Sequence, residues 1–195
     1  MAGLANEGFP GRFRLVLCDI FGVRNLMNRI LSVTAMVCLV GTLPLSAQMK
    51  HVDLKDAKGA SVGMAMISPA KGGGVSIDLD VHGLPPGEHA IHFHAVPKCE
   101  APFTTAGGHF NPMNKKHGME NPEGAHAGDM MNFTVDAKGA AKTTIVNKNV
   151  TLGAEPNSLY TNGGTALMIH AAADDMKTDP SGNAGDRIVC GAITK

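Results

Sequence analysis

The sequence predicts an all-β domain, an eight-stranded antiparallel sandwich or flattened barrel with two long functional loops. Three observations support this prediction. Short segments alternate apolar and polar residues, no segment carries an apolar stripe of helical period, and 24 glycines and 11 prolines among 195 residues indicate many turns. Tryptophan is absent and aromatic residues make up 4% of the chain, so we expect a core of aliphatic and methionine side chains.

The first 47 residues are expected to be a leader that stays outside this fold. An uncharged apolar run of sixteen residues, 30–45, follows Arg24 and Arg29 and precedes Ser46, Ala47 and Gln48. A positive segment, a short apolar segment and a small residue at the cut are typical of a secretory signal peptide, which predicts cleavage after Ala47. The protein would then be exported, to a periplasm or to the cell exterior, as a domain of residues 48–195.

Two other interpretations of the leader are less favourable. A transmembrane anchor is disfavoured because the run, interrupted by Gly41 and Pro44, is shorter than the ~20 residues that cross a bilayer. A lipoprotein at Cys38 is disfavoured because Val37 stands where a small residue is required. Met27 begins a conventional leader by itself, so we expect residues 1–26 to come from an over-extended gene start.

The cysteines predict one disulfide. Cys18 and Cys38 would leave with the leader, so that Cys99 and Cys190 remain. An even pair in an oxidising compartment forms a structural disulfide by default.

The strands follow from period-2 alternation. The clearest case is Val75–Val81, in which Val75, Ile77, Leu79 and Val81 alternate with polar residues. Glycine-rich turns separate it from similar runs. The other expected strands are 51–55, 61–67, 89–95, 131–136, 141–147, 165–170 and 187–193.

Two connections are too long for a compact β domain, 96–130 and 171–186. Structureless segments of this length are usually functional or disordered. The first is rich in glycine and proline and cannot bury enough apolar area to order itself. Something else must hold it, and it contains three histidines.

The histidines are the main chemical signal, since all nine follow residue 50. His92 and His94 lie in an expected strand, where alternate side chains share a face and lie about 6–7 Å apart at Cα. Taken alone, such a pair is more often a satisfied surface or core pair than a metal site. The long connection that follows adds His109, His117, His126 and Asp129.

Three imidazoles and one carboxylate complete a tetrahedral set for Zn²⁺, and a metal would order a loop that has no other support. His170 ends a further strand, and Asp174 follows as an acceptor that would orient an imidazole. Six histidines and an aspartate exceed the needs of one four-coordinate ion. They predict two sites or one binuclear site, for which imidazole-rich ligation suits copper and zinc.

Four stretches carry a specific resemblance: Gly87 to His94 (GEHAIHFH), Ala106 to Pro112 (AGGHFNP), His126 to Asp129 (HAGD) and Gly182 to Gly191 (GNAGDRIVCG). They look like the signatures of the copper/zinc superoxide dismutases. The resemblance runs in order from about Val52 to Ile193, nearly all of the expected mature chain.

The resemblance implies a Greek-key domain of the exported bacterial type that converts superoxide to dioxygen and hydrogen peroxide by cycling copper between Cu(II) and Cu(I). It implies one copper and one zinc per subunit and a possible homodimer. The implied copper ligands are His92, His94, His109 and His170, and the implied zinc ligands are His109, His117, His126 and Asp129.

The resemblance also assigns roles outside the ligand sets. Asp174 would link a copper histidine, His92, to a zinc histidine, His117, and Cys99 and Cys190 would form the disulfide within the subunit. Arg187 would guide the anion, and it is the only arginine after residue 47. His109 would bridge the two metals and carry a proton during turnover. Arg187 and His109 are therefore the expected catalytic residues.

For the remaining histidines, for one loop lysine and for the methionines near the loop histidines, a structural or solvated role is expected rather than a functional one. His51, His82 and His89 are expected to be surface histidines, and Lys177 a solvated loop lysine. Met113, Met119, Met130 and Met131 cluster around the loop histidines and could hand over Cu(I) during copper loading, but methionine is also common core filler.

Composition and motifs limit the alternative functions. Lys+Arg and Asp+Glu both number 17, so overall charge indicates no nucleic-acid partner, and we expect no stable membrane anchor. The main alternative is a non-catalytic copper/zinc-binding or metal-storage protein on the same fold. A metal-stabilised adhesion module would explain the disulfide but not the surplus of ligands.

Overall fold

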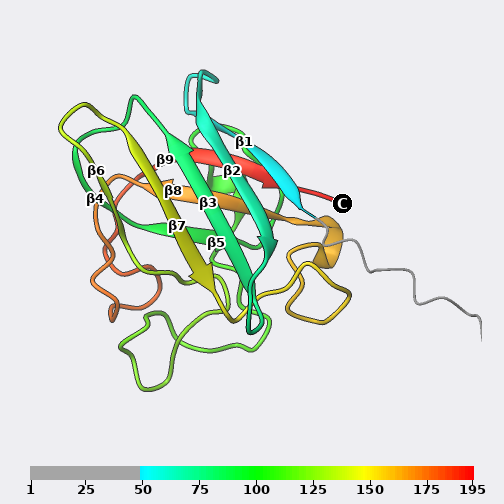
Figure 1. Cartoon of the computed structure of the whole chain (residues 1–195). Coiled ribbons are helices and arrows are strands. Elements are labelled where there is room, and N and C mark those ends of the chain that lie inside the picture. Colours follow the sequence, from blue (N-terminus) through cyan, green and yellow to red (C-terminus); the bar gives the residue numbers. More distant parts are fainter. Residues whose placement is uncertain (1–48) are drawn as a thin grey trace, which may run out of the picture. The chain divides into compact units, whose positions relative to one another are not determined.

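The structure, a computed structural model, describes residues 49–195 (Figure 1). The expected leader, with its start at Met27 and its cut after Ala47, lies outside the described residues. Across 49–195, no helix has both the length and the apolar character needed to cross a bilayer.

Nine strands form two antiparallel sheets, and the larger one curls into a half-barrel (Figure 1). The strand order of the larger sheet is β5-β8-β9-β1-β2-β3-β7, and β4 pairs with β6 in the smaller sheet. The bounds are β1 Lys50–Asp56, β2 Ser61–Pro69, β3 Val75–Val81, β4 Gly87–His89, β5 Ile91–His94, β6 Phe133–Val135, β7 Ala141–Asn147, β8 Thr165–His170 and β9 Arg187–Ile193.

Alternation places the core, as the sequence predicted. In β3 the apolar residues Val75, Ile77, Leu79 and Val81 are all buried, while Asp78 and the other polar residues face outward. Strand β3 pairs with β2 on one side and with the edge strand β7 on the other. The predicted all-β, antiparallel fold class is confirmed.

The predicted number of eight strands is wrong, because the expected strand 89–95 is divided at Ala90. Before this residue, β4 pairs with β6, and after it, β5 pairs with β8. Ala90 itself donates to Ala172 O and accepts from the His170 N–H (both 2.9 Å). The chain thus passes from one sheet to the other at a residue that is tied to the segment following β8.

The segments between β5 and β6 and between β8 and β9 contain little regular structure, as predicted for the long connections. A single 3₁₀ turn, Thr104–Ala106, lies in the first of them. The disulfide Cys99–Cys190 ties this connection to β9 across a sequence separation of 91. The connection is therefore anchored to the sheet near its start.

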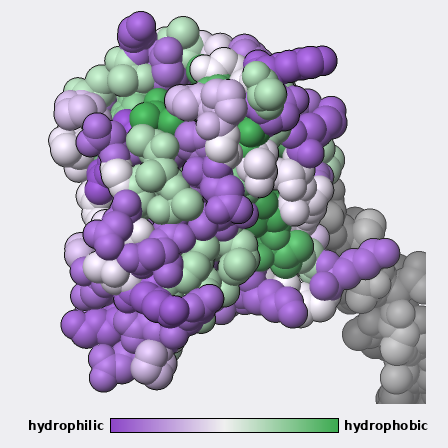
Figure 2. Space-filling model, turned by 90° about the vertical axis from the view of Figure 1, so that its left-hand side faces the viewer, coloured by the Kyte–Doolittle hydropathy of each residue, from purple (hydrophilic) through white to green (hydrophobic). Residues whose placement is uncertain are grey.

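The surface is mixed in character. On the face shown in Figure 2, hydrophobic side chains occur in small groups among hydrophilic ones, and the lower part is almost wholly hydrophilic.

Candidate metal centre

Two neighbouring strands place the first histidines. His92 and His94 lie on β5, and His170 is the last residue of β8, which pairs antiparallel with β5. Every residue of both strands is buried, so the imidazoles lie inside the protein. His109 reaches the same place from the long connection, where it forms an isolated bridge with His94.

Backbone hydrogen bonds to Phe93 hold the long connection against β5. The Phe93 N–H donates to Gly128 O (3.0 Å), and Phe93 O accepts from the Phe110 N–H (2.7 Å). The Gly128 N–H in turn donates to Phe110 O (2.8 Å). A Cβ at Gly128 would overlap Phe93 O, so this close approach requires glycine. His109 and Asp129, which flank these contacts in sequence, are thereby brought to the end of β5.

The first ligand cluster consists of His92, His94, His109 and His170. One nitrogen from each imidazole lies within 4.8 Å of the others, and all four residues are buried. Four nitrogens have no hydrogen-bond partner: His92 Nδ1, His94 Nε2, His109 Nε2 and His170 Nε2. Unpaired buried polar atoms are costly, so four that converge on one point indicate a site for a cation.

The other ring nitrogen of three of these histidines fixes the tautomer. His94 Nδ1 donates to Gly107 O (2.9 Å), His170 Nδ1 to Gly185 O (3.2 Å), and His92 Nε2 to Asp174 Oδ2 (2.8 Å). Each donor nitrogen carries the proton, so the partnerless nitrogen of the same ring presents a lone pair. The orientation that a metal requires is therefore set by the protein's own backbone and by one carboxylate.

Burial also keeps these imidazoles neutral. It lowers the pKa of His94 to about 2 and the pKa values of His109 and His170 to about 4. It lowers the pKa of His92 as well. At neutral pH all four rings are therefore in the uncharged form that binds metals.

The second cluster shares His109 and adds His117, His126 and Asp129, all buried. Asp129 Oδ1 lies 2.8 Å from His109 Nδ1 and 3.4 Å from His126 Nδ1, and Asp129 Oδ2 lies 3.1 Å from His117 Nδ1. The Nδ1 atoms of His109 and His126 are 3.4 Å apart. Ligand atoms about 2.05 Å from a tetrahedral zinc ion lie about 3.3 Å from one another. The cluster therefore fits zinc in both donor type and spacing.

Asp129 is held in place as an anion. Its Oδ2 accepts from the backbone N–H groups of Gly118 (2.9 Å) and His126 (3.0 Å). Burial raises the pKa of Asp129, but hydrogen bonds from His109, His117 and His126 outweigh burial and keep the pKa far below its ordinary value.

Asp174 joins the two clusters. Its Oδ2 accepts from His92 Nε2 (2.8 Å), and its Oδ1 lies 3.0 Å from His117 Nε2. Burial lowers the pKa of His117, but Asp129 and Asp174 outweigh burial and raise the pKa to about 9. Asp174 thus contacts one histidine of each cluster and favours a proton on Nε2 of both rings, the nitrogen that points away from the cluster.

Arg187 begins β9, opposite His170 in the ladder with β8. Its Nη1 donates to Phe103 O and its Nη2 to Gly107 O, both at 2.7 Å. Gly107 O also accepts from His94 Nδ1, so one carbonyl holds both the arginine and a histidine of the first cluster. The exposed Lys177, by contrast, lies 2.9 Å from Glu120 Oε2, so a neighbouring carboxylate offsets its charge.

The structure therefore brings together every predicted ligand residue, although sequence reasoning misplaced His89. His51 and His82 are exposed, as predicted, but His89 is buried. Its Nδ1 and Nε2 lie 2.8 Å from His170 O and Pro85 O, and its ring lies 6.0 Å from that of Phe133. The ring of His89 lies beside its register partner Phe133 and between two backbone carbonyls inside the protein rather than in solvent, which is why the surface prediction failed.

Sequence reasoning also missed two supporting residues. Asn132 Nδ2 donates to Asp174 O and Asn132 Oδ1 accepts from the Asp174 N–H, both at 2.9 Å. Asp179 Oδ1 accepts from the His117 N–H (2.7 Å). Both contacts involve a main chain far away in sequence, and no spacing pattern indicates them.

Comparison with known proteins agrees with this geometry. The family model for copper/zinc superoxide dismutase (SODC) matches residues 61–193. "Superoxide dismutase [Cu-Zn] 1" of Aquifex aeolicus is 45% identical over 163 residues, covering 82% of this chain and 96% of that protein. "Superoxide dismutase [Cu-Zn] 2" of the same organism is 46% identical over 171 residues, covering 86% and 99%. The crystal structure of a SOD-like protein from Bacillus subtilis superposes with a TM-score of 0.72 at 38% identity, covering 74% of this chain and 99% of that one.

Proposed function

Because the chain belongs to the copper/zinc superoxide dismutase family and is an enzyme of that type, we propose that it removes superoxide outside the cytoplasm at the two histidine clusters. The observation that carries this proposal is the convergence of four partnerless imidazole nitrogens beside a second, zinc-like ligand set that shares His109.

The donor chemistry assigns the metals. His92, His94, His109 and His170 form a set of imidazoles only, which suits copper. His109, His117, His126 and Asp129 include a carboxylate and have tetrahedral spacing, which suits zinc. When bound in the first set, copper would supply the redox chemistry, in which one electron passes from one superoxide to a second and two protons are taken up, giving dioxygen and hydrogen peroxide.

His109 is the residue that both sets share. Its Nε2 belongs to the first cluster and its Nδ1 to the second. Asp129 holds the Nδ1 side at 2.8 Å, so the ring keeps its orientation when Nε2 is free to take a proton. His109 Nε2, the nitrogen that faces the first cluster without a partner, would hold a proton for the peroxide product as a general acid.

Arg187 provides the positive charge for the substrate anion. Its two hydrogen bonds to Phe103 O and Gly107 O fix the guanidinium near the His94 side of the first cluster. Carbonyl oxygens occupy part of the donor fork, and the remaining N–H groups can bind superoxide. Arg187 would raise the local superoxide concentration and orient the anion next to the histidines.

The disulfide supports the export part of the proposal. The Cys99–Cys190 bridge is of the kind that forms and persists in oxidising compartments, which is consistent with export. We therefore assign residues 1–47 to a signal peptide and 48–195 to the mature enzyme. N-terminal sequencing of the protein recovered from cells should find Gln48, and a mature chain that begins before residue 30 would contradict the assignment.

The decisive experiment measures superoxide removal by the mature protein as isolated, after removal of metal by a chelator, and after reloading with copper and zinc. We expect activity to vanish with chelation and return only when copper is present. His170→Gln should abolish activity, whereas His82→Gln, at an exposed position outside both clusters, should not. A protein that binds both metals but removes no superoxide would instead be the non-catalytic metal-binding alternative.

A further inference from the structure

The large hydrophobic side chains on the surface share one chemical feature. Within residues 49–195, six are exposed, and five of these are methionines: Met49, Met64, Met113, Met119 and Met131, with Val146 as the sixth. Leucine, isoleucine and phenylalanine cover apolar surface equally well, but none is among the exposed residues. The pattern suggests that sulfur, rather than apolar area, is what these positions supply.

Two of these methionine positions lie next to a histidine on one face of the larger sheet. Met64 and Met66 are two residues apart on β2, so their side chains point to the same side. His51 on β1 is the register partner of Met66, and Asp53 is the partner of Met64. His51 is exposed, Met64 is 48% exposed and Met66 is partly buried, so all three lie on the outer face.

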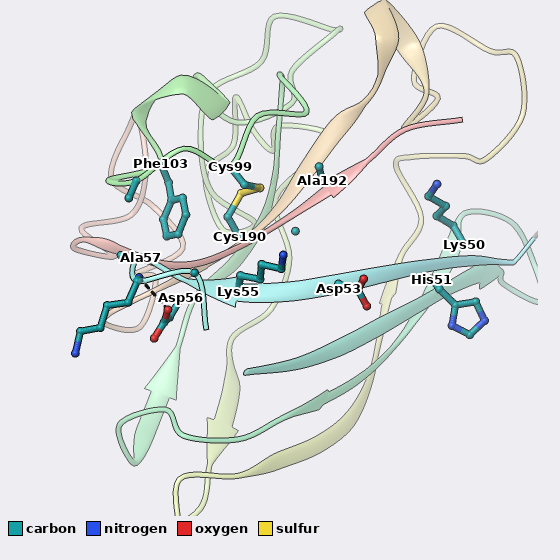
Figure 3. A pocket seen from close by; sticks show the side chains of 14 residues that line it. Lys50, His51, Asp53, Lys55, Asp56, Ala57, Cys99, Phe103, Cys190 and Ala192 are labelled. Carbon is teal, nitrogen blue, oxygen red and sulfur yellow. Dashed lines mark hydrogen bonds between the residues drawn. A yellow bond between two sulfur atoms is a disulfide. The ribbon is translucent and has the colours of Figure 1, made fainter. Parts of the chain in front are cut away.

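The register brings the donor atoms within reach of one ion. Directly opposed residues have Cβ atoms about 4.5–5.5 Å apart, and diagonal neighbours lie about 7–8 Å apart. The methionine side chain has three rotatable bonds, so both thioethers can reach the imidazole of His51 without movement of the backbone. Met64 and Met66 border a hollow of about 420 Å³ on the side toward β3 and β7, and His51 borders a separate hollow beside β1. In Figure 3 the ring of His51 projects from β1 on the side opposite to Lys50.

The surrounding charges favour a cation. On β3, Asp78 is the partner of Met66 and Asp80 is the partner of Met64, so three carboxylates, including Asp53, face the same side as the sulfurs. Lys142 offsets one of them, since its Nζ lies 2.9 Å from Asp80 Oδ2. Thr144 donates to Asp78 Oδ1 (2.6 Å), and Lys55 is the other basic residue on this face of β1.

We propose that His51, Met64 and Met66 form a surface site for one cuprous ion, here called the outer methionine site. Soft thioether donors select Cu(I), and an imidazole completes a mixed sulfur and nitrogen set. Met49, two residues before His51 and 59% exposed, is available as a further thioether. The outer methionine site differs in chemistry from the internal clusters, whose donors are nitrogen and oxygen alone.

The test uses the mature protein with both internal sites filled, reduced with ascorbate in the absence of oxygen so that added Cu(I) is not consumed. Cu(I) is titrated in competition with the chelator bicinchoninate, while the methyl signals of ¹³C-methyl methionine are followed by NMR. We expect one further Cu(I) per chain, with shifts confined to the signals of Met64, Met66 and Met49.

Variants locate the site. Met64→Ile with Met66→Ile should lower the affinity for the additional Cu(I) by more than roughly 100-fold. Loss of a contact that only supports a ligand costs roughly 10–100-fold in affinity, and here two ligands themselves are removed. Met113→Leu with Met119→Leu removes two exposed thioethers from the long connection and should leave the binding unchanged. Superoxide removal should be the same in both double variants, which checks that the fold and the internal sites are intact.

Three results would overturn the proposal: no Cu(I) beyond the resident metals, retention of the additional Cu(I) by the β2 double variant, or its loss from the loop double variant. If the β2 variant fails to fold, His51→Gln decides the matter. We expect it to weaken the additional Cu(I) and to abolish the shifts of the Met64 and Met66 methyl signals, and unchanged binding would refute the site.

Discussion

Removal of the Cys99–Cys190 disulfide should destabilise the protein strongly and disturb the substrate side of the metal centre. Figure 3 shows the bridge at a hollow beside β1, with the Phe103 side chain nearby. Cys190 is buried in β9 and Cys99 lies in the long connection, so the bridge joins the sheet to the segment that carries His109. Cys99→Ser with Cys190→Ala removes the bond and leaves no buried hydroxyl in β9.

The magnitude follows from the length of the closed loop. With a sequence separation of 91, the chain-entropy model gives a loss of about 4.6 kcal/mol in the free energy of unfolding at 25 °C. Small domains are stable by about 5–15 kcal/mol, so this loss would be a large share of the total. The same segment supplies Phe103 O and Gly107 O to Arg187, so the guanidinium should also lose its fixed position.

Urea unfolding of the metal-free proteins, followed by circular dichroism, measures the loss without the contribution of bound metal. The expected decrease for the double variant is about 2–5 kcal/mol. Wild-type protein reduced with dithiothreitol is the matched control and should unfold at nearly the same urea concentration as the variant. A decrease below about 1 kcal/mol would show that the bridge does not constrain the unfolded chain as the loop length requires.

Three further predictions concern the metal centre. Asp174→Asn should weaken zinc binding about 10–100-fold in a chelator competition, because His117 loses a charged outer partner, and unchanged affinity would contradict the linking role. Arg187→Ala should lower the second-order rate with superoxide by about tenfold or more and weaken its dependence on salt, while copper content stays the same and Arg187→Lys recovers part of the rate. Chelation of both metals should increase amide hydrogen exchange in the connection between β5 and β6 far more than in β2 and β3, and uniform exchange would refute the view that metals order this segment.

Much of the fold was predictable because one face of each long strand is buried. In β3 the alternation of Val75 to Val81 with polar residues specified the strand, its burial and its outer face. The strand 89–95 failed for a related reason. Parity correctly separates His89 from His92, but it does not say whether the other side meets solvent or the protein interior. Here the ring of His89 lies beside its register partner Phe133 of β6, its Nδ1 lies 2.8 Å from His170 O, and the chain changes sheets at Ala90.

The candidate ligands were predictable because metal chemistry restricts residue types so narrowly. Several histidines in a loop that cannot order itself point to a bound metal, and the resemblance supplied which histidine belongs to which set. The supporting contacts were not predictable. Asn132 binds the main chain of Asp174 at a separation of 42 residues, and Asp179 binds that of His117 at 62. An asparagine or aspartate in a turn-rich segment has many local uses, so only the folded arrangement identifies its partner.

One backbone carbonyl, that of Gly107, contacts both a histidine of the first cluster and Arg187. Gly107 O accepts from His94 Nδ1, which turns the lone pair of Nε2 into the first cluster, and from Arg187 Nη2, which holds the guanidinium. A shift of this carbonyl would therefore change the direction of the proposed copper ligand His94 and the position of the proposed anion site at Arg187 together. The segment that carries Gly107 is anchored to β9 by the disulfide at Cys99. Reduction of the disulfide should consequently lower copper affinity and the rate with superoxide in parallel, whereas Arg187→Ala should lower the rate alone.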